Sequence, residues 1–293
     1  MISVLQIPVC GVDPALGRLD YSSLSQQALM EMLIEGLEAV GKICGSREEP
    51  KEVEDWEGVD VEDTTGDVTK IDWESMGLKG LLDVQWMPAT VRYFDASVND
   101  IIGSFNPSDL PASIETALLY INSLTGPIDL RNLLEGIQKF DISHNQLSGS
   151  IDLRHLPQST QKLALNDNSF TGSVCLKNLP NGLEVLNIAQ NDLSGSMDLT
   201  NLPASLKKLY LHENRFAGEV NLQQLPTIKS ISLSDNAFSG STDFSRLPES
   251  VEYLDVSNTL LSGEMTLDDS LWGGFDVNNS SVIKNQMPPR EVG

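Results

Sequence analysis

The side chains best suited to proton transfer or metal binding at neutral pH are three histidines, His144, His155 and His212. A metal site or a catalytic triad requires several such groups to converge on one point. The sequence contains a tandem repeat, described below, and His144 and His155 fall at different points of one copy. His212 lies three copies further on, which corresponds to roughly 14 Å along a stack of strands spaced about 4.8 Å apart. Neither a P-loop nor a GxGxxG motif is present. We therefore predict that the protein is not an enzyme and carries neither a cofactor nor a metal.

The next candidates for chemistry are the three cysteines, Cys10, Cys44 and Cys175. Their odd number, without a CxxC pair or a nearby histidine, indicates reduced and partly buried thiols. The N-terminal stretch MISVLQIPVC lacks the charged region of a signal peptide, and Pro8 interrupts its apolar run. We expect a cytoplasmic protein, with the alternative that it is secreted if the true N-terminus lies upstream.

The composition of the chain restricts its partners. Its 293 residues include 42 acidic and 19 basic side chains, which give a formal net charge of −23. Such a charge repels nucleic acid and anionic membrane surfaces at long range. No run of about 18 or more apolar residues could cross a membrane. We therefore predict no nucleic-acid partner and no membrane span.

The element that must position these side chains is a tandem repeat. In one copy, the pattern LxxLxLxxNxFxG runs from Leu206 to Gly218. The closing glycine recurs at positions 80, 103, 126, 149, 172, 195, 218, 240 and 263, in seven steps of 23 residues and one of 22. The alternating leucines predict a half-buried strand, and a 23-residue coil gives parallel strands the return path that they need. Nine copies in register over residues 68–267 predict a solenoid.

The repeat resembles one known family. Its N-x-[LF]-[ST]-G stretch, present at 145–149, 191–195 and 236–240, is similar to that of leucine-rich-repeat proteins of the plant and protist types. The resemblance covers about two thirds of the chain. It implies an α/β leucine-rich-repeat solenoid: a curved right-handed coil with a parallel β-sheet on its concave face, a mostly irregular convex side and an N-terminal cap helix.

Three recurring positions of the repeat, which we call columns, are expected to stabilise the fold rather than to take part in catalysis. An asparagine recurs where each coil turns inward, at Asn99, Asn122, Asn145, Asn168, Asn191, Asn214 and Asn236. There a short amide can satisfy buried backbone groups, each of which would otherwise cost roughly 1–3 kcal/mol. The glycine allows a positive φ, and a proline column fixes the far corner. Met76 and Thr259 replace the asparagine in the first and last copies, as expected for terminal coils.

Residues 1–67 are expected to form an N-terminal cap with a helix and an acidic loop. Residues 22–41 predict that helix, with Ser23 and Gln26 as a capping box, an apolar stripe and Gly41 at its end. We interpret it as a cover for the open core, with partner docking as the alternative. The following Trp56-Glu57-Gly58-Val59 resembles the cap of plant extracellular repeat proteins, except that Val61 stands in place of a cysteine. The missing disulfide favours an intracellular setting.

Residues 268–293 are expected to form the C-terminal cap and a disordered tail. Trp272, Phe275, Val277 and Asn279 follow the repeat pattern closely enough to predict a truncated tenth strand. The stretch 284–293 contains two consecutive prolines and reads as disordered.

The outward positions of the predicted strands are the candidate binding surface. Large or basic side chains gather there, and we select nine of them as candidate protein-binding residues: Tyr93, Leu118, Tyr120, Lys139, Lys162, Lys208, Tyr210, His212 and Tyr253. Tyrosine is enriched at binding hot spots, although it also suits strands in general. The three lysines share one column and could pair with acidic groups of a partner.

These features favour a non-enzymatic protein–protein interaction or scaffold module that holds a protein partner on its concave face. The alternative is a secreted or surface recognition ectodomain that binds peptide or glycan. The plant-like repeat and the glycosylation sequons at Asn278 and Asn279 support the alternative, whereas the missing signal peptide and cap cysteines oppose it.

Overall fold

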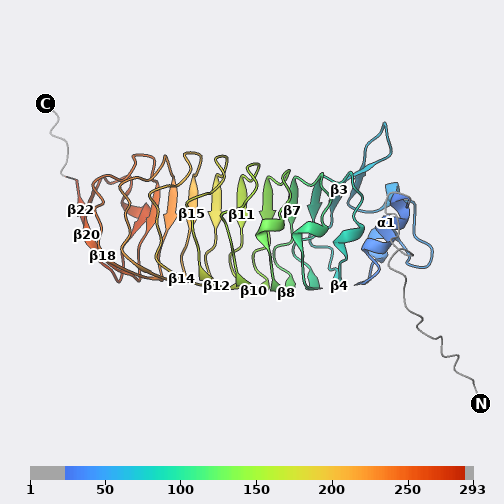
Figure 1. Cartoon of the computed structure of the whole chain (residues 1–293), viewed down its shortest axis with the longest axis horizontal. Helices are drawn as coiled ribbons and strands as arrows, with labels where there is room; N and C mark the ends of the chain where they lie inside the picture. Colours follow the sequence, from blue (N-terminus) through green and yellow to red (C-terminus); the bar gives the residue numbers. More distant parts are fainter. Residues whose placement is uncertain (1–23, 288–293) are drawn as a thin grey trace, which may run out of the picture.

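The computed structural model describes residues 24–287. Over these residues the chain winds into a long stack of similar coils, with the helices α1 and α2 at its N-terminal end (Figure 1). Each coil contributes one strand to each of two eleven-stranded sheets. The predicted solenoid is therefore confirmed. No helix in the described range is long and apolar enough to cross a membrane.

The first sheet is built from the alternating leucine segments that the sequence predicted. Its strands are β2 (Val59–Val61), β3 (Val68–Asp72), β5 (Tyr93–Asp95), β7 (Thr116–Leu118), β9 (Lys139–Asp141), β11 (Lys162–Ala164), β13 (Val185–Asn187), β15 (Lys208–Tyr210), β17 (Ser230–Ser232), β19 (Tyr253–Asp255) and β21 (Phe275–Asp276). In the three-residue strands from β5 to β19, the central residue faces the core. Leu163 lies beside Phe140 on one neighbouring strand and Leu186 on the other, and all three side chains are buried.

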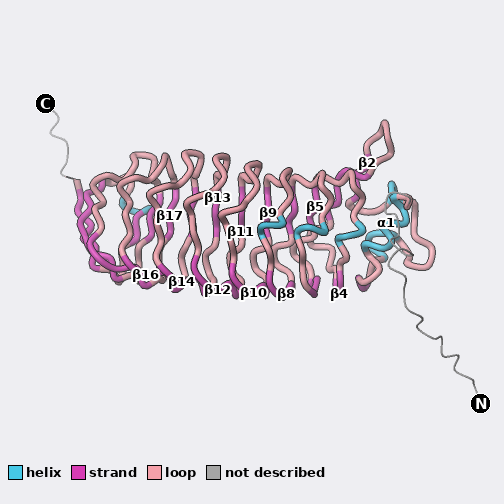
Figure 2. The backbone as a smooth tube through the Cα atoms, viewed as in Figure 1, coloured by secondary structure: helices cyan, strands magenta, loops and turns pink. Residues whose placement is uncertain are grey.

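The second sheet was not anticipated from the sequence. Its strands are β1 (Leu37–Glu38), β4 (Lys79–Leu81), β6 (Asp100–Gly103), β8 (Ser123–Pro127), β10 (Gln146–Ser150), β12 (Ser169–Ser173), β14 (Asp192–Gly195), β16 (Arg215–Gly218), β18 (Ala237–Ser241), β20 (Leu260–Leu267) and β22 (Ser281–Gln286). These strands form a second row along the stack (Figure 2). Each of β6 to β20 contains a repeat glycine with positive φ, such as Gly172 at +85°, a conformation that other residues rarely adopt.

Turns and short 3-10 helices join the two sheets. The helices are η2 (Val53–Asp55), η3 (Val84–Trp86), η4 (Pro107–Asp109), η5 (Leu130–Asn132) and η6 (Trp272–Gly274). An aspartate or asparagine follows the second sheet in most coils and accepts a hydrogen bond from the backbone two residues later. In one coil, Asp129 accepts from the N–H of Arg131 at 3.1 Å. Such a turn satisfies a backbone donor that the helix leaves without a partner.

The asparagine column fills the role that the sequence predicted for it. Asn168 accepts a hydrogen bond from the N–H of Leu147 at 3.0 Å. Its amide donates to the carbonyl oxygens of Ile142, Leu165 and Asn166 at 3.1, 3.2 and 3.3 Å. One side chain thus satisfies the backbone of its own coil and of the preceding coil.

The N-terminal cap differs from its prediction. The helix α1 (Gln26–Leu33) is capped by Ser25, which accepts from the N–H of Ala28, and it ends well before residue 41. Gly36 turns the chain into β1 instead, because a side chain at this position would lie 2.7 Å from the carbonyl oxygen of Leu81. Gly41, predicted to end the helix, begins α2 (Gly41–Cys44). Residues 22 and 23 of the predicted helix lie outside the described residues.

The cap nevertheless covers the first coil, as interpreted from the sequence. The side chains of Met30 and Leu33 in α1 are fully buried, and the cap strands β1 and β2 pair antiparallel with β4 and β3 of the first coil. Trp56 is also buried and donates its indole N–H to the carbonyl oxygen of Lys51. The cap therefore shields both the apolar core and the sheet edges at this end.

The C-terminal cap extends further than predicted. The truncated tenth strand is present as β21, which pairs with β19 through Phe275 and Asp276. The prediction of disorder from residue 284 is wrong for residues 284–286, because β22 (Ser281–Gln286) pairs with β20 over its whole length. The last part of the predicted tail, 288–293, lies outside the described residues.

We predict that Asn168→Ala destabilises the protein by about 3 kcal/mol, because it leaves one N–H and three carbonyl groups inside the coil without this partner. The free energy of unfolding measured by urea denaturation tests this. The matched control is Asn132→Ala, which removes an exposed amide in η5. Equal losses in the two variants would mean that the asparagine column is not what stabilises the coils.

Candidate functional site

The candidate binding surface is the outward side of the first sheet, which we call the first-sheet face. It has three columns, each with one residue from every coil. Column one contains Lys70, Tyr93, Thr116, Lys139, Lys162, Val185, Lys208, Ser230 and Tyr253. Column two contains Asp72, Asp95, Leu118, Asp141, Ala164, Asn187, Tyr210, Ser232 and Asp255. Column three lies two residues further on and contains Glu74, Ser97, Tyr120, Ser143, Asn166, Ala189, His212, Ser234 and Ser257.

The structure brings three of the predicted residues together at the N-terminal end of this face. Tyr120 reaches across two coils, and its hydroxyl group donates to the carboxylate of Glu74 at 2.9 Å. Leu118 lies two residues earlier, at the end of β7, and its partner residue on β5 is Asp95. The hydroxyl group of Tyr93 donates to Asp95 at 3.3 Å. Coils one to three therefore form a connected group of tyrosines and carboxylates.

Carboxylates outnumber ammonium groups around these tyrosines. Lys70 lies 3.1 Å from Asp72 and 3.8 Å from Asp60, and its ammonium group sits 5.3 Å from the centre of the Tyr93 ring. The hydrogen bond with Asp72 and the charges of Asp60 and Asp95 raise the pKa of Lys70. Burial, together with the charges of Asp95 and Asp72, raises the pKa of Tyr93 to about 12. The pKa of Tyr120 is raised as well, so Tyr93 and Tyr120 are both uncharged hydrogen-bond donors at neutral pH.

The predicted lysine column is interrupted. Lys139 and Lys162 are direct neighbours on β9 and β11, whereas Val185 separates Lys162 from Lys208. All three lysine side chains are exposed. Two adjacent ammonium groups, rather than a continuous stripe, therefore stand in the middle of the face.

The other predicted residues meet at the C-terminal end of the face. The rings of Tyr210 and His212 meet edge to face, with centroids 6.2 Å apart. Ser230 donates a hydrogen bond to the hydroxyl group of Tyr210 at 3.2 Å. Tyr253 is 40% exposed and its hydroxyl group donates to Asp255. The nine residues selected from the sequence therefore form two separate aromatic groups, with Lys139 and Lys162 between them and Lys208 on the strand of Tyr210.

Two residues at the edge of the face were not predicted from the sequence. Val98 and Ile121 each precede an asparagine of the asparagine column, and their backbone φ angles are +56° and +53°. Other residues in this left-handed column are Ser75, His144, Asp167, Gln190, Glu213, Asp235, Asn258 and Asn279, all of them polar. Two apolar side chains in a polar column are a signal that the sequence contains, although it becomes meaningful only once the backbone conformation is known.

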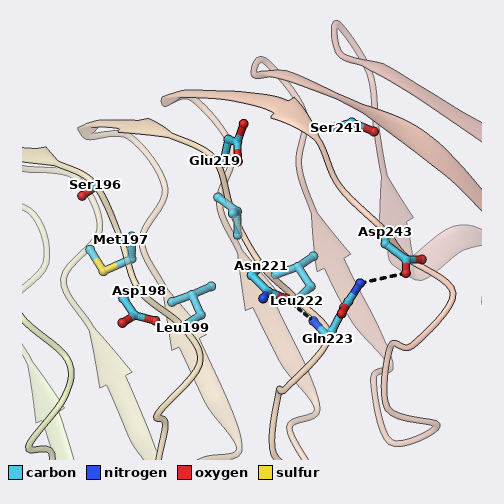
Figure 3. Close-up of a pocket in the computed structure, with 11 residues that line it drawn as sticks. Ser196, Met197, Asp198, Leu199, Glu219, Asn221, Leu222, Gln223, Ser241 and Asp243 are labelled. Atoms are coloured by element: carbon cyan, nitrogen blue, oxygen red, sulfur yellow. Dashed lines mark hydrogen bonds between the residues drawn. The ribbon is translucent and has the colours of Figure 1, made fainter.

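Two grooves open on the far side of the molecule, where the chain leaves the second sheet. One, of about 500 Å³, is lined by residues from 196 to 243, and in it Gln223 donates to Asp243 at 2.9 Å (Figure 3). The other, of about 1040 Å³, contains Arg131, Arg154 and the exposed Cys175. Each arginine is already paired with an aspartate of its own turn. Within the described residues, no group of three or more His, Cys, Asp and Glu side chains could hold a metal ion.

Comparison with protein-family models gave no match, and neither did comparison with curated protein sequences. Solved structures do match. The Arabidopsis receptor kinase HAESA, in complex with the peptide hormone IDA and the co-receptor SERK1, has a TM-score of 0.63 and 22% identity over 88% of this chain and 50% of its own. A plant ice-binding protein has a TM-score of 0.65 and 19% identity over 90% of this chain and 87% of its own.

YopM from Yersinia enterocolitica matches with a TM-score of 0.50 and 25% identity over 71% of this chain and 46% of its own. A further structure of the HAESA leucine-rich-repeat ectodomain has a TM-score of 0.58. The chain spans about half the length of these receptor and YopM chains. It therefore has the leucine-rich-repeat fold, and the resemblance inferred from its repeats is confirmed.

We predict that Asp141→Asn stabilises the protein at pH 7. Burial raises the pKa of Asp141, although hydrogen bonds from Ser143 oppose the shift. A raised carboxyl pKa means that folding favours the neutral form, so stability is present below the usual pKa and is lost as the pH rises. Asparagine keeps an acceptor for the Ser143 N–H, 3.0 Å away, without the charge.

Thermal unfolding measures the effect. We expect the variant to melt roughly 2 °C higher than the wild type at pH 7 and no higher at pH 3. The control Asp100→Asn makes the same change of net charge on an exposed side chain of β6. A gain that persists at pH 3, or appears equally in the control, would contradict the burial argument.

Proposed function

We propose that the protein is a non-enzymatic interaction module that binds a protein partner on its first-sheet face. The observation that carries this proposal is the gathering of tyrosines on this face: Tyr93, Tyr120, Tyr210 and Tyr253 are four of the five in the chain. Each presents an aromatic ring beside a hydroxyl group with a fixed hydrogen-bond partner. Aromatic side chains held in one position lose little entropy on binding.

The dimensions of the face support a protein partner. Nine coils at about 4.8 Å each give a surface of roughly 40 Å, the length of a standard protein interface. Aromatic groups at both ends and polar residues between them suit an elongated partner better than a small molecule, which prefers one deep apolar pocket. The structural match to HAESA, which was solved with a peptide hormone, is consistent with such a use of the fold.

We also propose that the protein works in a reducing compartment, as a cytoplasmic scaffold rather than a secreted recognition ectodomain. Cys44 is buried in the cap, Cys175 is exposed in a groove, and both are free. Val61 lies in β2, at the position where the resemblance to extracellular repeat proteins would place a cap cysteine. These thiols support the proposal because a free exposed cysteine is vulnerable to oxidation outside the cell.

We predict that Tyr120→Ala and Tyr210→Ala each weaken partner binding by about 1–3 kcal/mol, with little change in stability. The partner is obtained by a tagged pull-down from native cells, and its affinity is then measured by titration. Arg131→Ala, on the far side of the molecule, serves as the control. Full affinity in both tyrosine variants, together with loss in the control, would place the binding surface elsewhere.

We propose a second candidate function, ice binding, for the second sheet. Neighbouring strands there align small hydroxyl side chains: Ser150 lies opposite Thr171, and Ser173 opposite Ser194. These four residues are uncharged in a chain of net charge −23. Such hydroxyl groups can hold water in an ordered layer, because each both donates and accepts. The array is short, because Asp192 lies opposite Thr171 and Arg215 opposite Ser194 on the next strands. The structural match to a plant ice-binding protein over 87% of that chain supports this candidate.

An ice-recrystallisation assay separates the two candidates. If the second sheet binds ice, the protein inhibits recrystallisation, and Thr171→Lys abolishes the inhibition by placing a hydrated charge on the array. Tyr120→Ala, on the other sheet, leaves it unchanged. Absence of inhibition in the wild-type protein would rule out this candidate without affecting the first.

A further inference from the structure

The N-terminal end of the first-sheet face carries an uncompensated negative charge. Asp60, Asp72 and Asp95 gather around one ammonium group, that of Lys70, and Glu74 lies near the tyrosines Tyr93 and Tyr120. Two of these carboxylates also accept hydrogen bonds from tyrosines, which brings no positive charge. The next lysine of column one, Lys139, stands three coils away. Coils one to three therefore carry a local excess of three negative charges, of which the carboxylate of Asp95 is buried and the others are at least partly exposed.

Apolar surface lies directly beside these charges. Ile121 is 46% exposed, and Leu118 and Val98 are half-buried. Ile121 follows Tyr120 in the chain, and Tyr120 extends from there towards Glu74. Apolar side chains therefore occur in the same coils as the carboxylates, and Leu118 lies directly opposite Asp95.

The backbone beneath this apolar edge is strained. β-Branched residues are disfavoured in the left-handed region, at a cost of roughly 1–2 kcal/mol each. Val98 and Ile121 occupy it at φ of +56° and +53°. Neither side chain is fully buried, so core packing does not offset this cost. Every described coil adopts this conformation at the same position, so the fold requires the backbone, whereas it gives no reason for a β-branched residue there.

We propose that coils one to three bind a segment of the partner in which lysine or arginine stands next to an aliphatic or aromatic side chain. The cation is held by Asp72 and Glu74, and the apolar side chain packs on Leu118 and Ile121 against the ring of Tyr120. This inference rests on the proposed function and adds the chemistry of the partner to it. The adjacent Lys139 and Lys162 disfavour a second cation further along the face.

A random peptide library of about twelve residues, long enough to cross the nine strands of the face, is the probe. It is selected on the full-length protein, and the most enriched peptide is synthesised for titration. We expect enriched sequences to pair lysine or arginine with Leu, Ile, Val or Phe. We expect Asp72→Asn/Glu74→Gln and Tyr120→Ala each to weaken that peptide roughly tenfold or more.

The variant Ile121→Asn distinguishes a binding role of Ile121 from a purely structural one. Asparagine tolerates the left-handed backbone, so this variant should melt at a higher temperature than the wild type and yet bind the peptide more weakly. The control Glu135→Gln/Glu249→Gln removes two exposed charges outside the face. It should leave the affinity unchanged, which separates local recognition from general attraction to an acidic chain.

Three results would overturn the inference. Enrichment of neutral or acidic peptides that depend on Tyr210 rather than Tyr120 would show that the chemistry is wrong, while leaving the proposed function in place. An equal loss of affinity in the Glu135→Gln/Glu249→Gln control would reduce the recognition to net charge. Absence of any enriched peptide that is sensitive to changes on this face would count against both the inference and the proposed function.

Discussion

Every coil of this solenoid must carry its backbone into the interior and out again, and buried amide and carbonyl groups cannot remain without hydrogen bonds. The asparagine column meets this requirement. Asn168 and its equivalents accept from a backbone N–H of the preceding coil and donate to carbonyl groups of both coils. Because every amide bridges two coils, no coil in the middle of the stack is complete alone. The stack therefore gains stability by nearest-neighbour addition.

That arrangement leaves the outward positions unconstrained by folding. The inward residues, such as Leu163 and Leu186, are apolar and buried in every coil, while their neighbours on the same strands range from lysine to alanine. Where an outward residue departs from what the backbone prefers, the fold gives no reason for it. Ile121 at a positive φ is such a case, and its neighbourhood of tyrosines and carboxylates gives the departure a use.

The sequence predicted those parts of the fold that depend on period alone. Leucines in alternation at a fixed spacing determine both the strands of the first sheet and which side chains face outward. The second sheet was missed because its strands, such as Ser169–Ser173, contain a glycine among small polar residues and read as turns. The helix at 22–41 was overestimated because the break at Gly36 depends on a contact with Leu81, 45 positions along the chain. Likewise, β22 exists only through its pairing with β20.

For the candidate site, the sequence predicted which residues lie on the outward side of the first sheet. It did not predict which residues their side chains contact. Tyr120 was assigned to the outward side from its spacing, but its hydrogen bond to Glu74 crosses two coils, and no pattern in the sequence specifies which way a long side chain extends.

The distribution of charge over the surface also could not be predicted from the sequence. A net charge of −23 describes the whole chain, whereas the structure concentrates carboxylates around Lys70 on one sheet and aligns uncharged hydroxyl groups such as Ser173 and Ser194 on the other. The two sheets are separated by a fully buried core, so a substitution on one surface leaves the other unaltered. The electrostatic character of each surface can therefore be changed, and its contribution measured, without disturbing the asparagine bonds that hold the coils together.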